Sequence, residues 1–401
     1  MPPKDGESFP LDEVADITVG FVGPMKSEYV EEGIPFLRSQ NVKPFRIDLA
    51  DVKYINDSFH NRLSKSSLRP GDVVVVRTGT PGTAAVIPAT LPIANCSDLV
   101  VIRPHGNLDP WYLSYFINGA AKGFVSSRLV GAVQQHFNVG SARELKLPNL
   151  QLAEQQAIAS VLRPLDAKAE ANRRTVSILS ELLSATWTES FETAESLEWP
   201  IYPIGEVASV VGGSTPKTAI RDFWGGTISW ATPKDLSRLP SAPLLGTERR
   251  ITELGLRQIS SGLLPKGTVL LSSRAPIGYL AIAEVPVAIN QGFIAIIAKE
   301  RLSNLYLWQW MQAHMEEIKS RANGTTFLEV SKASFRPVLI SIPPSGAMQS
   351  WTNWAAPQYR LIVEREKESR ILARSRDALL PKLLSGELRV REAKSLVEDA
   401  V

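Results

Sequence analysis

The chain has 401 residues, 44% of them hydrophobic, with 44 basic against 41 acidic side chains and one cysteine. This length exceeds one ordinary core, so we expect two or more domains. No run approaches ~18 uninterrupted apolar residues and the first residues lack a signal-peptide pattern, so we expect neither a membrane span nor secretion. The lone Cys96 excludes an intramolecular disulfide and fits a reducing cytoplasm, and we expect it in the core.

The two halves of the chain repeat one another. FPLDEVADI at 9–17 matches YPIGEVASV at 202–210, and LRPGDVVVVRTGTPGTAAVI at 68–87 matches LPKGTVLLSSRAPIGYLAI at 264–282. The spacing is nearly constant, because Pro203 follows Pro10 by 193 residues and Gly267 follows Gly71 by 196. A spacing this steady indicates a tandem duplication.

Each repeat begins with a body of short strands and turns. The apolar, β-branched runs that predict strands are Val73–Val76, Ala85–Ile87, Leu99–Ile102, Thr268–Leu271, Leu280–Ala283 and Phe293–Ile297. One short helix is expected in each body, at Pro110–Asn118 and at Asn304–Glu317.

Each body is followed by a long helical tail. In the first tail a strict 4-3 spacing predicts a coiled-coil seam with one polar member, at positions 158, 162, 165, 169, 172, 176, 179 and 183. The same template gives a weaker seam with a polar middle in the second tail, at positions 351, 355, 358, 362, 365, 369, 372, 376, 379 and 383. Each helix would expose an apolar stripe alone, so we expect the two to pair as a rod about 50 Å long.

The glycine-rich stretch VVVVRTGTPG at 73–82 has the outline of a phosphate-binding loop, but the details disagree. It lacks the lysine of a P-loop, precedes another strand, and does not match GxGxxG. Gly79 and Gly82 are therefore predicted to form a hairpin turn. Its copy, SSRAPIG, keeps an arginine displaced by one position, so Arg77 and Arg274 are predicted to make paired contacts with DNA.

Catalytic patterns are missing from the sequence. The four histidines lack HxxxH or HExxH spacing, which argues against a zinc site. There is no GxSxG elbow, no NPPY-like tetrapeptide and no glycine loop for a methyl donor. We therefore expect a chain without catalytic residues, metal or cofactor.

A second pair of loops leads to a known family. LVGAVQQHFNVGSARELKLP at 129–148 corresponds to RANGTTFLEVSKASFRPVLISIP at 321–343, and the first leads into LAEQQAIASVL. Together with RDALLPKLLSGELRV at 376–390, this pattern resembles the specificity subunit of type I restriction-modification systems. The resemblance covers residues 9–391.

The resemblance implies an α+β architecture of two tandem, β-rich target recognition domains. Each is followed by a long helix, the helices pair as an antiparallel coiled coil, and the whole has internal pseudo-two-fold symmetry. The expected segments are domain 1 at 1–149, the central spacer helix at 150–198, domain 2 at 199–345, and the C-terminal helix and tail at 346–401.

The resemblance also implies the partners. They are double-stranded DNA with a bipartite site, two adenine-methyltransferase subunits and restriction-translocase subunits. Base reading requires side chains with paired donors and acceptors on loops. The candidates are Ser39, Gln40, Asn41, Lys43, Arg77, Thr78, Gln134 and Gln135 in the first body, and Thr232, Lys234, Asp235, Arg274, Thr325 and Thr326 in the second. For each single residue a solvated loop side chain or a helix cap is an equal alternative.

Two other functions stay open at the level of sequence. One is a duplicated DNA-binding regulator or architectural protein outside restriction-modification, which would bind DNA without a methyltransferase partner. The other is a free-standing enzyme, which rests only on the glycine loops.

Overall fold

The computed structural model describes residues 8–128, 136–300, 302–324 and 328–398. The chain divides into two compact units, residues 1–170 with 370–401 and residues 171–369. Each unit holds one body and a stretch of both long helices, α5 (Leu152–Phe191) and α12 (Ser345–Leu384). The division between the units therefore falls inside the helices and not in a loop.

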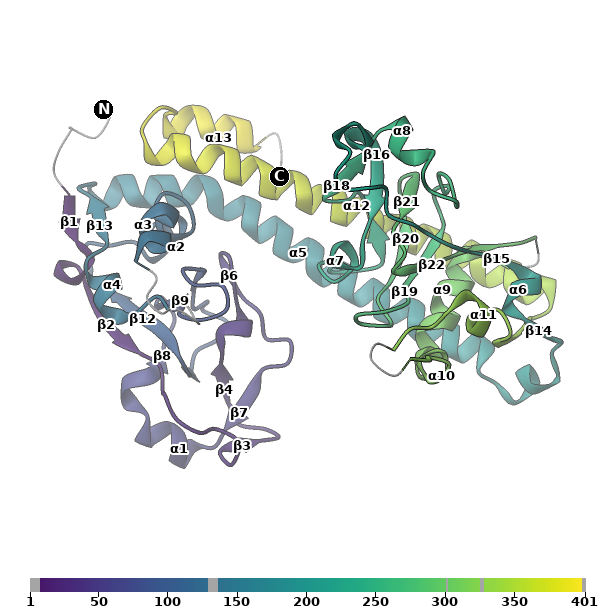
Figure 1. The fold of residues 1–401 in the computed structure, drawn as a ribbon. Helices are drawn as coiled ribbons and strands as arrows, with labels where there is room; N and C mark the ends of the chain where they lie inside the picture. The colour runs from purple at the N-terminus through teal and green to yellow at the C-terminus, as the bar shows by residue number, and fades with distance from the viewer. Residues whose placement is uncertain (1–7, 129–135, 301, 325–327, 399–401) are drawn as a thin grey trace. The chain divides into compact units, whose positions relative to one another are not determined.

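Two sheets form the first body (Figure 1). The four-stranded antiparallel sheet consists, in order, of β10 (Ala84–Val86), β9 (Val73–Val76), β12 (Leu99–Pro104) and β2 (Ala15–Val19). The five-stranded sheet consists of β3 (Tyr29–Val30), β7 (Lys53–Ile55), β4 (Ile34–Leu37), β11 (Ala94–Cys96) and β8 (Ser67–Leu68). Two short pairs are β1 (Ser8–Pro10) with β13 (Lys146–Pro148) and β5 (Val42–Lys43) with β6 (Arg46–Ile47). The body's helices are α1 (Asp57–Arg62), α2 (Pro110–Asn118), α3 (Lys122–Ser127) and α4 (Val139–Arg143).

The run of four valines in β9 is buried on both faces of its sheet. Val73 and Val75 belong to a core with α2 and α5, whereas Val74 and Val76 belong to a core with β4 and β11. Successive side chains of a strand point to opposite faces, so an unbroken apolar run marks a strand covered on both sides. Cys96 is fully buried in the second of these cores, which confirms its prediction as a core residue.

The second body repeats this plan. Its larger sheet consists of β15 (Ala208–Gly212), β22 (Phe293–Ala298), β19 (Val269–Ser272), β20 (Leu280–Ala283) and β17 (Pro243–Leu244). Its smaller sheet consists of β18 (Arg249–Ile251), β16 (Trp224–Ala231) and β21 (Val287–Ile289), and β14 (Ile201–Pro203) pairs with β23 (Leu339–Ser341). The helices are α6 (Ile204–Val207), α7 (Pro233–Leu236), α8 (Glu253–Leu256), α9 (Asn304–Ala313), α10 (Met315–Ser320) and α11 (Lys332–Phe335).

The duplication extends to single hydrogen bonds. Gly71 and Gly267 share a φ of +92°, where glycine is favoured, and their amides donate to the carbonyls of Ile87 at 3.0 Å and Ala283 at 2.7 Å. Strand β9, within VVVVRTGTPG, pairs antiparallel with β10, which follows this stretch, so the two strands lie on either side of Gly79 and Gly82. This confirms the predicted hairpin.

The predicted bounds of β9, β20 and α2 agree with the structure. The prediction of one helix over Asn304–Glu317 was wrong, because the structure has two helices, α9 and α10, that break at His314. His314 leaves the helical region with a ψ of 22°, and its Nδ1 lies 3.0 Å from the carbonyl oxygen of Trp310. Its ring also stacks on the Trp310 ring. These contacts end the first helix in a way that apolar spacing does not reveal.

The long helices pair in antiparallel order. In one unit Asp166 of α5 bonds Arg376 of α12 at 2.7 Å, and in the other Asn172 of α5 bonds Glu368 of α12 at 2.9 Å. The apolar members of the predicted α5 seam are buried or partly buried, and the polar member, Asn172, is 3% exposed. Its partner Glu368 also forms an ion pair with Arg365 at 2.6 Å, so these polar side chains in the middle of the helix pair have partners.

The seam predicted for α12 needs correction in its middle. Gln358, Arg365 and Ser369 are only half-buried, whereas Tyr359 and Glu366 are buried. The reason is that this part of α12 faces the second body as well as α5. Tyr359 donates to Glu284 at 2.8 Å, and Glu366 accepts from Ser241 at 2.7 Å.

Partly buried carboxylates join each body to the helices. In the first unit Asp166 accepts from the Tyr115 hydroxyl at 2.6 Å as well as from Arg376, and in the second Glu284 accepts from Tyr359 and pairs with Lys266 at 2.9 Å. Burial and the adjacent Glu284 charge hold the pKa of Tyr359 well above its usual value. A last helix, α13 (Val390–Glu398), packs Ala393 and Val397 into the core of the first unit.

Candidate nucleic-acid interface

Three loops converge at one edge of each body, where strands end. In the first body the loop after β4 meets the loop after β11, because the Ser97 amide donates to the Leu37 carbonyl at 3.0 Å. The loop after β9 joins them, because Arg77 bonds Asp98 at 2.6 Å. Strands β4 and β11 are parallel, so their carboxyl ends meet at the same edge. The loops at 39–43 and 77–78 are thus brought together.

The second body assembles the equivalent edge. The amide of Asn290, after β21, donates to the carbonyl of Ala231, the last residue of β16, at 3.0 Å. The amide of Ser273, after β19, donates to the carbonyl of Gly292 at 2.8 Å. The candidate residues at 232–235 and 274 therefore lie on neighbouring loops. We call this edge the strand-end edge. It comprises residues 37–43, 77–78 and 97–98 in the first body and residues 231–235, 273–274 and 290–292 in the second.

Arg77 and Thr78 share one carboxylate. Arg77 Nη1 lies 2.6 Å from Asp98 Oδ1, and the Thr78 hydroxyl donates to Oδ2 at 2.8 Å. Asp98 is held with a positive φ of 50°, which fixes its direction. The pair is partly exposed, with 20% of the Arg77 side chain and 37% of the Asp98 side chain open to solvent. The exposed part of the guanidinium and the Thr78 oxygen therefore stay available to a ligand, whereas the Arg77 Nε is buried.

Asn41 organises the first loop from inside the protein. It is fully buried, its Oδ1 accepts from the Arg38 amide at 3.0 Å, and its Nδ2 donates to the carbonyls of Asp48 and Ala50. Its neighbours are more open, with Gln40 exposed and Ser39 and Lys43 half-buried.

Thr232 and Asp235 play the matching role in the second body. They form a capping box at the start of α7, in which Asp235 Oδ2 accepts from the Thr232 amide at 2.8 Å and from its hydroxyl at 2.7 Å. Asp235 Oδ1 accepts from the Glu248 amide at 2.8 Å. Lys234 is exposed and lies 3.1 Å from Glu248, and this lysine lowers the pKa of that carboxyl.

Arg274 occupies the position of Thr78 and not that of Arg77. The Phe137 amide donates to the Arg77 carbonyl at 3.1 Å, and the Val330 amide donates to the Ser273 carbonyl at 3.0 Å, so Ser273 matches Arg77. Arg274 is half-exposed and lies 3.7 Å from Glu329. The remaining four candidates, Gln134, Gln135, Thr325 and Thr326, lie outside the described residues.

Comparison with known proteins adds the family. The model of the type I restriction modification DNA specificity domain matches residues 3–178 and again residues 196–350. The chain belongs to the type I restriction-modification DNA specificity family.

Individual relatives agree with this assignment. The MjaIX specificity subunit of Methanocaldococcus jannaschii is 38% identical over 177 residues, which cover 44% of this chain and only 41% of that protein. The putative MjaX specificity subunit of the same organism is 21% identical over 417 residues, covering 97% of this chain and 95% of that protein. The crystal structure of the type I S subunit from M. genitalium has the same fold, with a TM-score of 0.59, 15% identity and coverage of 96% of this chain and 99% of that one.

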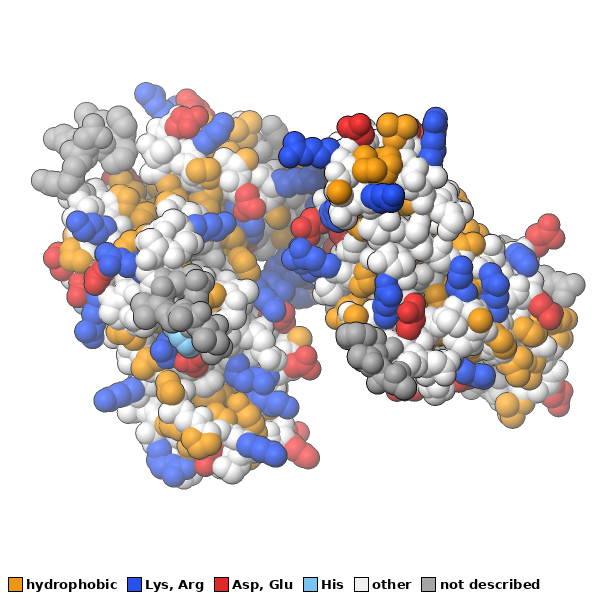
Figure 2. Space-filling view, viewed as in Figure 1, with side chains coloured by type: hydrophobic (Ala, Val, Ile, Leu, Met, Phe, Trp, Pro, Cys, Tyr) orange, Lys and Arg blue, Asp and Glu red, His pale blue; other side chains and the backbone are white. Residues whose placement is uncertain are grey.

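Sequence reasoning missed one basic residue at the strand-end edge of this family member. Arg249 is exposed at the start of β18, and its guanidinium carbon lies 3.6 Å from the centre of the Trp224 ring and 5.1 Å from that of Trp230. The signal was present in the repeat, because Arg249 follows Lys53 by 196 residues, the same spacing as the glycines. Figure 2 shows lysine and arginine side chains spread over the viewed face of each body.

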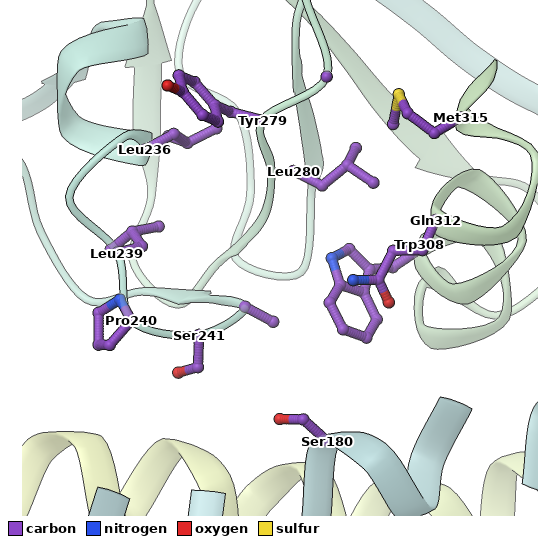
Figure 3. Close-up of a pocket in the computed structure, with 12 residues that line it drawn as sticks. Ser180, Leu236, Leu239, Pro240, Ser241, Tyr279, Leu280, Trp308, Gln312 and Met315 are labelled. Atoms are coloured by element: carbon purple, nitrogen blue, oxygen red, sulfur yellow. The ribbon is translucent and has the colours of Figure 1, made fainter. Parts of the chain in front are cut away.

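The second unit also holds a pocket of about 480 Å³, which Leu236 lines at the end of the loop at 231–235. Figure 3 shows Trp308 and Gln312 on one side of it, Pro240 and Ser241 on the other, and Ser180 of α5 below. No histidine, cysteine or carboxylate lines it. Within the described ranges no three His, Cys, Asp or Glu side chains are grouped to hold a metal ion, and no described helix is long and apolar enough to cross a membrane.

Proposed function

We propose that this chain is the DNA-recognition subunit of a type I restriction-modification enzyme and reads a bipartite site in double-stranded DNA, one half with each body. The observation that carries the proposal is the repeated strand-end edge, built by the same loops with matching hydrogen bonds in both bodies. Two copies of one reading surface suit two half-sites, as in dimeric DNA-binding proteins whose half-sites lie roughly 34 Å apart.

Among the described candidates, the proposed contacts are those with side chains that are exposed or partly exposed. Arg274 and Lys234 carry donors that partners within the protein occupy only in part, and the Thr78 oxygen can still accept a hydrogen bond although its hydroxyl donates to Asp98. Asn41, Thr232 and Asp235 instead position the loops, because their polar atoms are bonded to nearby backbone or side-chain groups. The proposed contacts among the described residues are Ser39, Gln40, Lys43, Arg77, Thr78, Lys234 and Arg274. On the sequence pattern alone we add Gln134, Gln135, Thr325 and Thr326.

The helices would set the spacing between the half-sites. In this proposal residues 1–149 and 199–345 read DNA, and residues 150–198 and 346–401 form the spacer and tail. The chain itself would perform no chemistry. Two adenine-methyltransferase subunits and restriction-translocase subunits would assemble on it in the cytoplasm, where chromosomal DNA is accessible.

An exchange of one body tests the proposal. Residues 199–345 are replaced with the corresponding body of another family member, and N6-methyladenine is mapped in cells that express the hybrid with the partner methyltransferase. We expect one half of the methylated motif to change and the other half to stay as in the wild type. A motif that changes in both halves, or in neither, would contradict the assignment of one half-site to each body.

A second measurement addresses the partners. The chain is purified from its host with a tag, and we expect a methyltransferase to copurify at two copies per chain. Sequence-specific DNA binding by the chain with no methyltransferase in the preparation would favour the regulator instead.

A further inference from the structure

The Arg249 guanidinium lies over the Trp224 ring at the strand-end edge of the second body. Strand β18 pairs antiparallel with β16, so Arg249 lies opposite Trp230, at the end of β16 that leads into the loop at 231–235 (Figure 1). Trp224 and Trp230 are themselves packed edge to face, with ring centres 5.0 Å apart. An arginine that stacks on an indole keeps its plane fixed and its in-plane N–H groups open.

The charge of Arg249 is not neutralised by a described acidic side chain, unlike the charges of three other basic residues of this body. Lys234 and Arg238 both pair with Glu248, and Arg274 pairs with Glu329. Within the part of the chain that the structure describes, Arg249 has neither an ion pair nor a side-chain hydrogen bond. Five donors with a fixed plane and no acceptor within the protein suit an external acceptor.

Arg249 is also tied to the proposed reading loop. Its backbone carbonyl accepts from the Thr247 hydroxyl at 2.7 Å, and that hydroxyl accepts from the Trp230 amide at 3.1 Å. The preceding residue, Glu248, is bonded through its amide to Asp235. The start of β18 and the loop at 231–235 thus form one connected surface.

The first body has a basic residue in the same register. Phe36 of β4 lies opposite Lys53 of β7, as Trp230 lies opposite Arg249. Lys53 is exposed, and among the described residues it has no ion pair. A basic side chain beside a buried aromatic therefore recurs at the matched position of both bodies.

Resting on the proposed function, we propose that Arg249 is a base-reading residue of the second body, and that its stacked guanidinium donates two hydrogen bonds to a guanine in the major groove. The stack is the reason to assign a base and not a phosphate. A phosphate can be bound by a guanidinium fork but also by a positive charge alone, whereas a bidentate contact with guanine requires an oriented planar fork.

The test compares Arg249→Lys with Arg250→Lys. Arg250 is the next residue of β18, also exposed, and its side chain points to the opposite face. Each variant is expressed as the full chain with its partner methyltransferase, and N6-methyladenine is mapped across the host genome. Arg249→Lys keeps the charge but loses the fork, so we expect tolerance of other bases at one G·C position in one half of the motif, with discrimination reduced roughly 5- to 150-fold.

The other half of the motif serves as an internal control, and Arg250→Lys should leave both halves unchanged. An unchanged motif with Arg249→Lys would overturn the proposal, and so would a uniform loss of methylation at all sites, which marks a phosphate contact. Failure of the proposed function would look different, because the wild-type chain itself would then direct no bipartite motif.

Discussion

Single residues at the strand-end edge divide into those that build loops and those that face outward. Asn41 and Asp235 occupy matched positions and both accept a hydrogen bond from a backbone amide three residues earlier, at 3.0 Å and 2.8 Å. A carboxylate can replace the amide because only the acceptor is used in this contact. Arg77 and Arg274 instead pair with carboxylates while keeping solvent-exposed surface. Ion pairs of this kind hold a side chain in place with little net cost, so exchange with a DNA acceptor remains possible.

Arg274→Ala and Glu329→Gln should act in opposite directions. Loss of the guanidinium is expected to weaken binding to the cognate duplex by about 1–3 kcal/mol, whereas loss of the Glu329 charge frees the arginine and should strengthen binding at low salt. Fluorescence anisotropy with cognate and scrambled duplexes measures both effects. Tighter binding by Arg274→Ala, or weaker binding by Glu329→Gln, would contradict this role.

At this scale the sequence predicts residue types and positions but not their partners. Arg77 finds Asp98 and Arg274 finds Glu329 only after strands distant in sequence have paired. No local pattern carries this information. The burial of Asn41 has the same origin, since two of its acceptors follow it by 7 and 9 residues on a loop with irregular structure.

Among the elements, the strands are the most predictable and the second long helix is the least. The four valines of β9 mark a doubly covered strand by composition alone, and their bounds coincide with the prediction. Helix α12 has a seam for α5 and a second buried face for the body beside it. One heptad template describes only the first of these faces, so it omits Tyr359 and Glu366. The break between α9 and α10 was missed because the contacts of His314 with Trp310 interrupt no apolar spacing.

The contact between Tyr359 of α12 and Glu284 of the second body should make the stability of the folded chain fall at alkaline pH. Burial and the Glu284 charge raise the pKa of Tyr359 in the folded state above the value near 10 of an unfolded chain. The stabilisation is therefore complete below about pH 10 and is lost as the pH rises further, because the unfolded tyrosine ionises first. Melting temperatures from pH 7 to 11 should fall less steeply for Tyr359→Phe than for the wild type.

The same substitution should cost about 1–3 kcal/mol at pH 7, because the hydrogen bond to the Glu284 carboxylate is lost while Lys266 still pairs with it. Tyr279→Phe is the matched control, since no hydrogen bond of the Tyr279 hydroxyl is found in the described part of the chain. Equal alkaline slopes for Tyr359→Phe and the wild type would contradict the linkage.

On the scale of the whole molecule, the proposed function assigns both recognition and spacing to the repeat. The family model matches each half separately, and each unit combines a body with parts of both helices. The duplication was visible in the sequence because glycine and proline positions required by turns persist at a constant spacing. The bases that each body reads were not predictable, since readout depends on side-chain geometry that residue types do not fix.

The length of the helix pair should determine the length of the unread gap in the methylated motif. One extra heptad placed after Glu170 in α5, with another after Ser369 in α12, lengthens a helix pair by roughly 10 Å while keeping the seam in register. This corresponds to about three base pairs of DNA, so the unread gap of the methylated motif should grow by about three while both half-sites stay the same. An unchanged gap at full methylation would show that the helices do not set the distance.

The most direct test of DNA recognition by this chain is the N6-methyladenine map of its host with and without the gene. We expect a bipartite motif in the wild type that disappears on deletion and returns when the gene is restored. A methylation map that is unchanged by the deletion, while the partner methyltransferase is expressed, would contradict the account.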